Sequence, residues 1–67
     1  MMRLNVENMH CQHCVRAITA ALQALDPNAS VQVDLSKGEV RAEGNFSAEA
    51  AIRALAEEDY PARLLDD

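Results

Sequence analysis

The sequence predicts an α+β sandwich, in which a four-stranded antiparallel sheet carries two helices on one face. Its 67 residues leave room for one domain, 1–67, because so short a chain buries only about 60% of its unfolded surface. Apolar and polar residues alternate in three short segments, apolar residues recur every three or four positions in two longer ones, and a short, mainly apolar segment follows the second of these. The resulting order, strand, helix, strand, strand, helix, strand, is that of the ferredoxin-like βαββαβ sandwich.

A strand, a loop and a helix account for the first part of the chain. Residues 2–7 alternate apolar and polar side chains and predict a strand, and the mostly polar residues 8–12 predict a loop. Residues 13–25 predict a helix that ends before Pro27, since proline cannot extend it. The helix face that we expect to be buried carries Cys14, Ala17, Ile18, Ala21, Leu22 and Leu25.

A hairpin is predicted in the middle of the chain. Residues 30–35 place Val or Leu at every second position, which is typical of a strand. The turn that follows contains Gly38, which is free to adopt a positive φ. Residues 39–43 predict a weaker strand, because their apolar side chains are only Val40 and Ala42.

The last part of the chain predicts a second helix and a short strand. Ser47 is a suitable N-cap for a helix over 48–58, which the residues 59–61 end. The face of this helix that we expect to be buried carries Ala48, Ala51, Ile52, Leu55 and Ala56. Residues 62–65 predict the final strand.

Charge and length exclude several classes of function. Six Lys and Arg against eleven Asp and Glu give a net charge of −5, so we expect no nucleic-acid partner. No segment approaches the roughly 18 apolar residues of a membrane span, and no secretory signal is recognisable, so we expect a protein that is not membrane-embedded. A domain this small has no room for a cleft between two lobes. We therefore expect a non-enzymatic protein of the reducing cytoplasm, where both thiols stay free.

The residues that carry chemistry are concentrated where the first strand gives way to the first helix. Both cysteines and both histidines of the chain lie in one short run, Met9-His10-Cys11-Gln12-His13-Cys14. Cys14 falls in the first turn of the predicted helix, where unpaired backbone N–H groups and the helix dipole stabilise a thiolate. The run therefore predicts a site built on two thiolates.

Two thiolates favour a soft metal ion. A closed structural zinc site needs four ligands, usually as two separated pairs, and this chain has no Cys or His after Cys14. Thiolate softness selects Cu(I), which two sulfurs can hold with positions left open for an incoming ligand. These residues predict a site that binds Cu(I) and passes it on by ligand exchange.

The whole chain resembles the heavy-metal-associated domain family, and most of all its free-standing bacterial copper chaperones. The resemblance rests on the length, the order of elements, the motif Met9-x-Cys11-x-x-Cys14 in the first loop and Tyr60 before the last strand. It implies Cu(I) on the two cysteines, docking onto the metal-binding domain of a copper-transporting P-type ATPase, and a packing role for Met9.

Two positions bear on where the chain stands within that family. His10 precedes the first cysteine, where the zinc, cadmium and lead branch carries Asp or Glu. Asn8 occupies a position that is commonly glycine in the family, and since asparagine tolerates a positive φ we expect the turn to survive.

Several residues keep two interpretations at this point. His10 and His13 are either exposed polar residues or additional ligands, and Met9 is either core or a sulfur ligand. Tyr60 is either a lone core aromatic or, as we expect, a shield that keeps water from the thiolates. The acidic run 57–59 is either a solvated surface or a docking surface that steers a partner.

Other functions also remain as alternatives. The same fold and motif can carry another soft or borderline metal such as mercury, silver or zinc. A small thiol-disulfide redox protein that uses Cys11 and Cys14 is a further alternative. We expect a monomer without metal, and the sequence leaves a copper-bridged dimer open.

Overall fold

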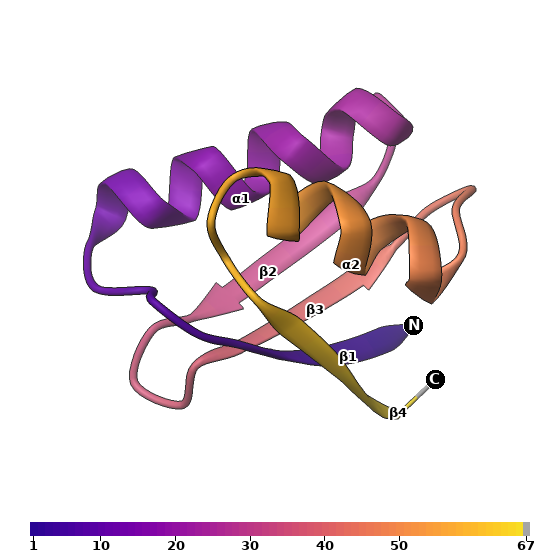
Figure 1. Cartoon of the computed structure of the whole chain (residues 1–67). Helices are drawn as coiled ribbons and strands as arrows, with labels where there is room; N and C mark the ends of the chain where they lie inside the picture. The colour runs from indigo at the N-terminus through magenta and orange to yellow at the C-terminus, as the bar shows by residue number, and fades with distance from the viewer. Residues whose placement is uncertain (67) are drawn as a thin grey trace.

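A computed structural model describes residues 1–66. Its elements, in chain order, are β1 (Met2–Val6), α1 (Gln12–Leu25), β2 (Ser30–Asp34), β3 (Glu39–Glu43), α2 (Ala48–Glu57) and β4 (Ala62–Asp66). The four strands form one antiparallel sheet in the order β2-β3-β1-β4, and both helices lie on the same face of it (Figure 1). The predicted ferredoxin-like sandwich is confirmed, and each predicted element is present with ends that differ by at most one residue.

The inner strands β1 and β3 hold the centre of the core. Leu4 of β1 lies opposite Val40 of β3 on one side and Leu64 of β4 on the other. Val40 and Ala42 are fully buried. The strand that the sequence marked as weaker is therefore central, because the topology inserts it beside β1 beneath the helices, where even a short side chain such as alanine loses all contact with water.

Each helix buries a line of side chains that steps by four residues. In α1 the buried residues are Cys14, Ile18 and Leu22, and in α2 they are Ala51 and Leu55. The expectation that Leu25 is buried was wrong, since it is 41% exposed. Continuing the line from Leu22 by four residues reaches position 26, where the helix has ended, so Leu25 lies to one side of it. The expectation that Ala56 is buried was also wrong, because it follows Leu55 directly and so lies about 100° around α2 from the buried line.

Local signals end the elements as expected. The Ser47 side chain caps α2 by accepting a hydrogen bond from the backbone N–H of Ala50 at 3.0 Å. Gly38 has a φ of 65°, the positive value that its turn requires. The Asp26 carboxylate accepts backbone N–H groups from Asn28 and Asn45, and so ties the end of α1 to the loop before α2.

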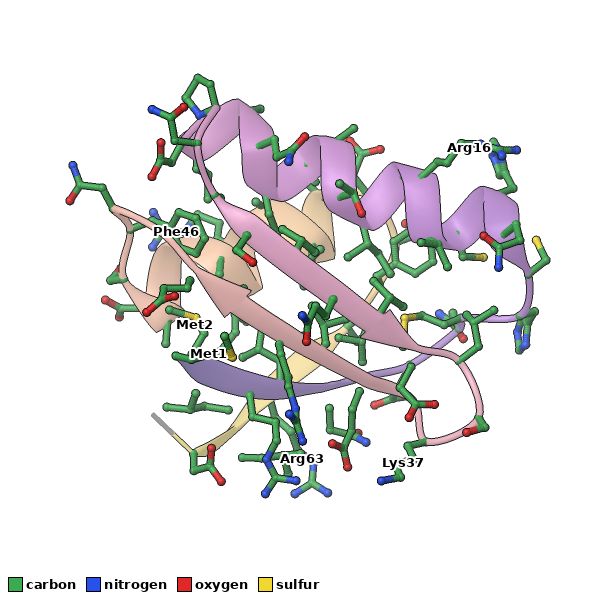
Figure 2. The ribbon with its side chains drawn as sticks, turned by 180° about the vertical axis from the view of Figure 1, so that it is seen from behind. Met1, Met2, Arg16, Lys37, Phe46 and Arg63 are labelled. Atoms are coloured by element: carbon green, nitrogen blue, oxygen red, sulfur yellow. The ribbon has the colours of Figure 1, made fainter. Side chains whose placement is uncertain are left out.

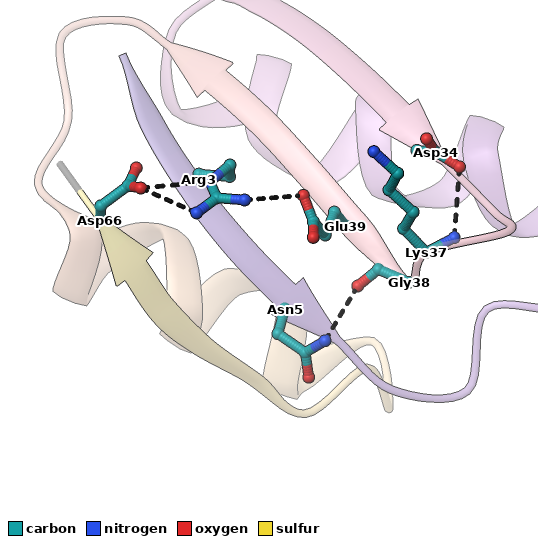
Figure 3. Close-up of polar contacts among 7 residues, drawn as sticks. All are labelled: Arg3, Asn5, Asp34, Lys37, Gly38, Glu39 and Asp66. Carbon is teal, nitrogen blue, oxygen red and sulfur yellow. Dashed lines mark hydrogen bonds and ion pairs between the residues drawn. The ribbon is translucent and has the colours of Figure 1, made fainter.

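The face of the sheet away from the helices is polar. Arg3 at its centre forms ion pairs with Glu39 at 3.2 Å and Asp66 at 2.9 Å (Figure 3). Lys37 and Arg63 project from the same side of the sheet (Figure 2). Within residues 1–66, no helix is long and apolar enough to cross a membrane.

Three connections meet at one end of the sandwich. The backbone N–H of Val6, at the end of β1, donates to Gly38 of the β2–β3 turn at 2.8 Å. The next residue, Glu7, donates to the carbonyl of Pro61, between α2 and β4, at 2.9 Å. The connection from β1 to α1, which carries Cys11 and leads into the first turn of α1 with Cys14, is therefore held between the other two.

Candidate metal centre

The two cysteines occupy different places at the start of α1. Cys11 is the N-cap residue, and its carbonyl oxygen accepts the backbone N–H of Cys14 at 3.0 Å. Its side chain caps nothing and is exposed, whereas Cys14 is only 8% exposed. One thiol therefore faces solvent while the other is set into the edge of the core.

The sulfur atoms are close enough to share one ion. Cys11 Sγ and Cys14 Sγ lie 4.0 Å apart, and both thiols are free. A metal–thiolate bond is about 2.3 Å long for zinc, so a single soft ion between these sulfurs can contact both. Residues 1–66 contain no group of three or more His, Cys, Asp or Glu side chains placed to hold a metal ion. The two sulfurs therefore suit a metal ion that can be held by two sulfur ligands.

The surroundings of Cys14 favour its thiolate. The backbone N–H of His10, 3.5 Å from Cys14 Sγ, is the largest cause that lowers the pKa of this thiol to about 7. The Tyr60 hydroxyl is the next largest cause and the backbone N–H of Cys11 follows, while burial works in the opposite direction. Near neutral pH, about half of the Cys14 side chains are thus in the thiolate form.

Tyr60 lies beside this sulfur, as the sequence led us to expect. It is half-buried, and its side chain packs against a core cluster that includes Met9 and Cys14. The neighbouring Cys14 sulfur is also the main cause that raises the pKa of the Tyr60 hydroxyl to about 12. The phenol therefore stays protonated and able to donate to the thiolate at any physiological pH.

The remaining residues of the run divide into buried and exposed. The Met9 side chain is 8% exposed and belongs to the hydrophobic core cluster, the position expected of a packing residue. His10 and His13 are both exposed. The structure thus brings Cys11 and Cys14 together with Tyr60, and it leaves the two imidazoles in solvent.

Asn8 makes a contact that the sequence did not reveal. Its φ is 70°, so the expected positive φ is confirmed. In addition, its side-chain amide donates to the carbonyl oxygen of Asp59 at 3.1 Å. The signal for the turn was visible in the sequence, but this bond joins residues that are 51 positions apart and only the fold brings them together.

The acidic run also lies at this end of the molecule. Asp59 is in direct contact with the cysteine-bearing connection through Asn8, and Glu57 and Glu58 end α2 just before it. Arg16 projects from α1 near the same end (Figure 2). The surface around the two thiols is therefore more acidic than basic.

Comparisons with known proteins agree with this geometry. The sequence profile of the Heavy-metal-associated domain family matches residues 3–61. A copper chaperone CopZ from Staphylococcus haemolyticus is 38% identical over 85% of this chain and 88% of its own length. Copper chaperone Atx1 from Synechocystis PCC6803 superposes with a TM-score of 0.90 at 32% identity, over 94% of this chain and all of that one. A gold binding protein superposes with a TM-score of 0.89 at 30% identity, over 96% of this chain and 98% of that one.

Proposed function

The chain belongs to the heavy-metal-associated domain family, and on that premise we propose that it is a copper chaperone that binds Cu(I) through Cys11 and Cys14. The observation that carries the proposal is the pair of reduced thiols with sulfurs 4.0 Å apart. Two thiolates suit Cu(I) better than zinc when, as in residues 1–66, no third ligand is grouped with them. The copper chaperones among the similar proteins support copper as the cargo.

The same geometry favours release. Because Cys11 is exposed, the thiolate of an acceptor can approach a Cu(I) ion held between the two sulfurs. It enters as a third ligand, one cysteine of the chaperone leaves, and a second acceptor thiolate then displaces the other cysteine. The copper remains Cu(I) and stays bound to sulfur throughout. The protein acts as a carrier and not as an enzyme.

Loss of either thiol tests the binding site. In reduced, anaerobic protein, Cys11→Ser and Cys14→Ser should each abolish stoichiometric Cu(I) binding against a chelator of moderate strength. His13→Asn is the matched control and should bind as the wild type does, since His13 is exposed. Tight stoichiometric binding by either serine variant would refute the proposed ligands. Weakened binding by His13→Asn would indicate that the His13 imidazole is a further ligand.

The protein could alternatively carry a soft ion other than Cu(I), and one specific observation favours this. A gold binding protein is similar to this chain over nearly its whole length, and thiolate pairs do not distinguish sharply among soft monovalent ions. Competition between Cu(I), Ag(I) and Zn(II) under one chelator separates the cases. We expect the two monovalent ions to bind far more tightly than zinc, and tighter binding of zinc would contradict the assignment.

We propose the metal-binding domain of a copper-transporting P-type ATPase as the acceptor, reached in the cytoplasm by the metal-loaded chaperone. The acidic surface near the thiols would steer association with a basic partner. Glu57→Lys together with Glu58→Lys should slow association with such a domain at low salt and have little effect at high salt. Asp59 is left unchanged, because its φ of 69° would strain a lysine.

The control for charge alone is Glu43→Lys, at the far end of β3. This variant should associate at the rate of the wild type. An unchanged rate for the double variant at Glu57 and Glu58 would remove the docking role of the acidic surface.

A redox function is tested with metal-free protein. The two thiols could form a disulfide, and a low thiol pKa is typical of redox-active cysteines. We expect no appreciable catalysis of insulin reduction, because Cys14 is only 8% exposed to a protein disulfide. Turnover that depends on Cys11 and Cys14 would favour the redox alternative.

A further inference from the structure

Asn8 connects the cysteine-bearing loop with the turn that carries Tyr60. Its side-chain amide donates to the Asp59 carbonyl at 3.1 Å, and Tyr60 is the next residue. Its own carbonyl oxygen lies 3.7 Å from Cys14 Sγ and accepts from that thiol. One residue therefore contacts both the buried sulfur and the turn that places a phenol beside it.

The backbone makes this contact specific. Asn8 and Asp59 are the two residues other than glycine within residues 1–66 that have a positive φ, at 70° and 69°. The hydrogen bond therefore joins the two residues at which the backbone adopts a positive φ. Asparagine supplies both requirements at position 8, since it tolerates this conformation and carries a donor. Glycine would supply the first requirement only.

A second bond fixes the same two segments without any side chain. The backbone N–H of Glu7 donates to the Pro61 carbonyl at 2.9 Å, on the other side of Tyr60. Tyr60 thus lies between two residues that are each hydrogen-bonded to the cysteine-bearing loop. Of these two attachments, only the one made by Asn8 can be removed by substitution without touching the backbone.

We propose that Asn8 is a positioning residue, whose amide clips the turn at Asp59 to the metal loop and thereby holds Tyr60 against the buried sulfur. This inference rests on the proposed function for its consequence, which is the rate at which Cu(I) leaves the site. With the clip in place, the Tyr60 ring and hydroxyl cover one side of Cys14. Without it, the ring is free to move away and an incoming ligand reaches the ion more readily.

The decisive variant is Asn8→Gly. Glycine adopts the φ of 70° without strain, so the turn is retained while the amide is lost. The matched control is Asn5→Ala, which removes a bond of the same kind, from an asparagine amide to the Gly38 carbonyl at 3.4 Å (Figure 3). That bond ends on the β2–β3 turn and contacts neither Tyr60 nor the cysteines.

The first measurement needs no metal. The chain has one Tyr and no Trp, so its intrinsic fluorescence reports on Tyr60 alone. In reduced, metal-free protein, Asn8→Gly should raise the quenching of this fluorescence by acrylamide toward that of the unfolded chain, and Asn5→Ala should leave it unchanged. Equal quenching in Asn8→Gly and wild type would overturn the proposal, whether or not the protein binds copper.

The second measurement separates positioning from general loosening. Asn8→Gly should accelerate the transfer of Cu(I) to a chelator by roughly two- to tenfold, the effect expected from one hydrogen bond. Tyr60→Ala, which removes the covering ring, should also accelerate it, and adding Asn8→Gly to Tyr60→Ala should give little further change. Equal acceleration by Asn8→Gly in both backgrounds would show that Asn8 does not act through Tyr60.

The two proposals fail in different ways. A wild-type protein that does not hold Cu(I) would refute the proposed function, and the acrylamide measurement would still decide whether the clip positions Tyr60. Normal Cu(I) binding with a transfer rate that Asn8→Gly does not change would refute the clip alone.

Discussion

The titration of Cys14 is the most direct consequence of the geometry around the thiols. The perturbation is Tyr60→Phe, made in a Cys11→Ser background so that a single thiol titrates. The Tyr60 hydroxyl is the second largest cause of the low pKa of Cys14, after the backbone N–H of His10. Removing it should therefore raise the pKa of Cys14 from about 7 without restoring the ordinary value of about 8.5.

The size of the effect follows from these two limits. At pH 7 a thiol with a pKa of about 7 is half ionised, whereas one with a pKa of about 8.5 is ionised to roughly 3%. Tyr60→Phe should give a fraction between the two. Because the thiolate is favoured in the folded state, its contribution to stability is present above the unfolded pKa and is lost as the pH falls through the folded pKa.

The assay is the absorbance of the thiolate near 240 nm as a function of pH in reduced, metal-free protein. Tyrosine ionisation does not interfere, since the pKa of the Tyr60 hydroxyl is about 12. The control is Asn5→Ala, which should titrate as its parent does. A pKa near 8.5 in the parent, or an identical pKa with and without the Tyr60 hydroxyl, would refute this account of the site.

Three further predictions concern the fold. Backbone N–H groups of Asn45 and then Asn28 hold the pKa of Asp26 below its usual range, so the stability that this carboxylate contributes is lost as the pH falls through the lowered pKa. Asp26→Asn should therefore make the urea midpoint fall less steeply as the pH is lowered below 4. A curve equally steep in the variant would contradict this. Ser47→Ala should lower the free energy of unfolding by about 1 kcal/mol, because the N-cap bond is lost, and an unchanged urea midpoint would count against that bond. Leu55→Ala should lower it by roughly 2–5 kcal/mol, whereas alanine at the exposed Leu25 should stay within about 0.5 kcal/mol; similar losses at both sites would contradict the packing described.

Local rules were sufficient for the elements of the fold. The alternation around Leu4 and Val33, the cap at Ser47 and the positive φ at Gly38 all follow from short stretches of sequence, and the structure contains each of them. The spacing of apolar residues along a helix failed to predict burial where burial depends on what packs against that helix. Leu25 has the spacing of a core residue, but it lies beyond the last buried turn of α1.

The candidate site shows the same division. The two cysteines and their place at the start of α1 could be predicted, since they lie three positions apart and need only the strand-to-helix boundary. The position of Tyr60 beside Cys14 followed from the predicted topology. The bond from Asn8 to Asp59 could not be predicted, because its geometry depends on two turns far apart in sequence that meet only in the folded chain.

X-ray absorption at the copper edge of anaerobically Cu(I)-loaded protein tests the central claim most directly. We expect a monovalent edge and a first coordination shell of two sulfur atoms, supplied by Cys11 and Cys14. A first shell made of nitrogen or oxygen would contradict this claim. A two-sulfur shell that persists after Cys14→Ser would contradict it as well.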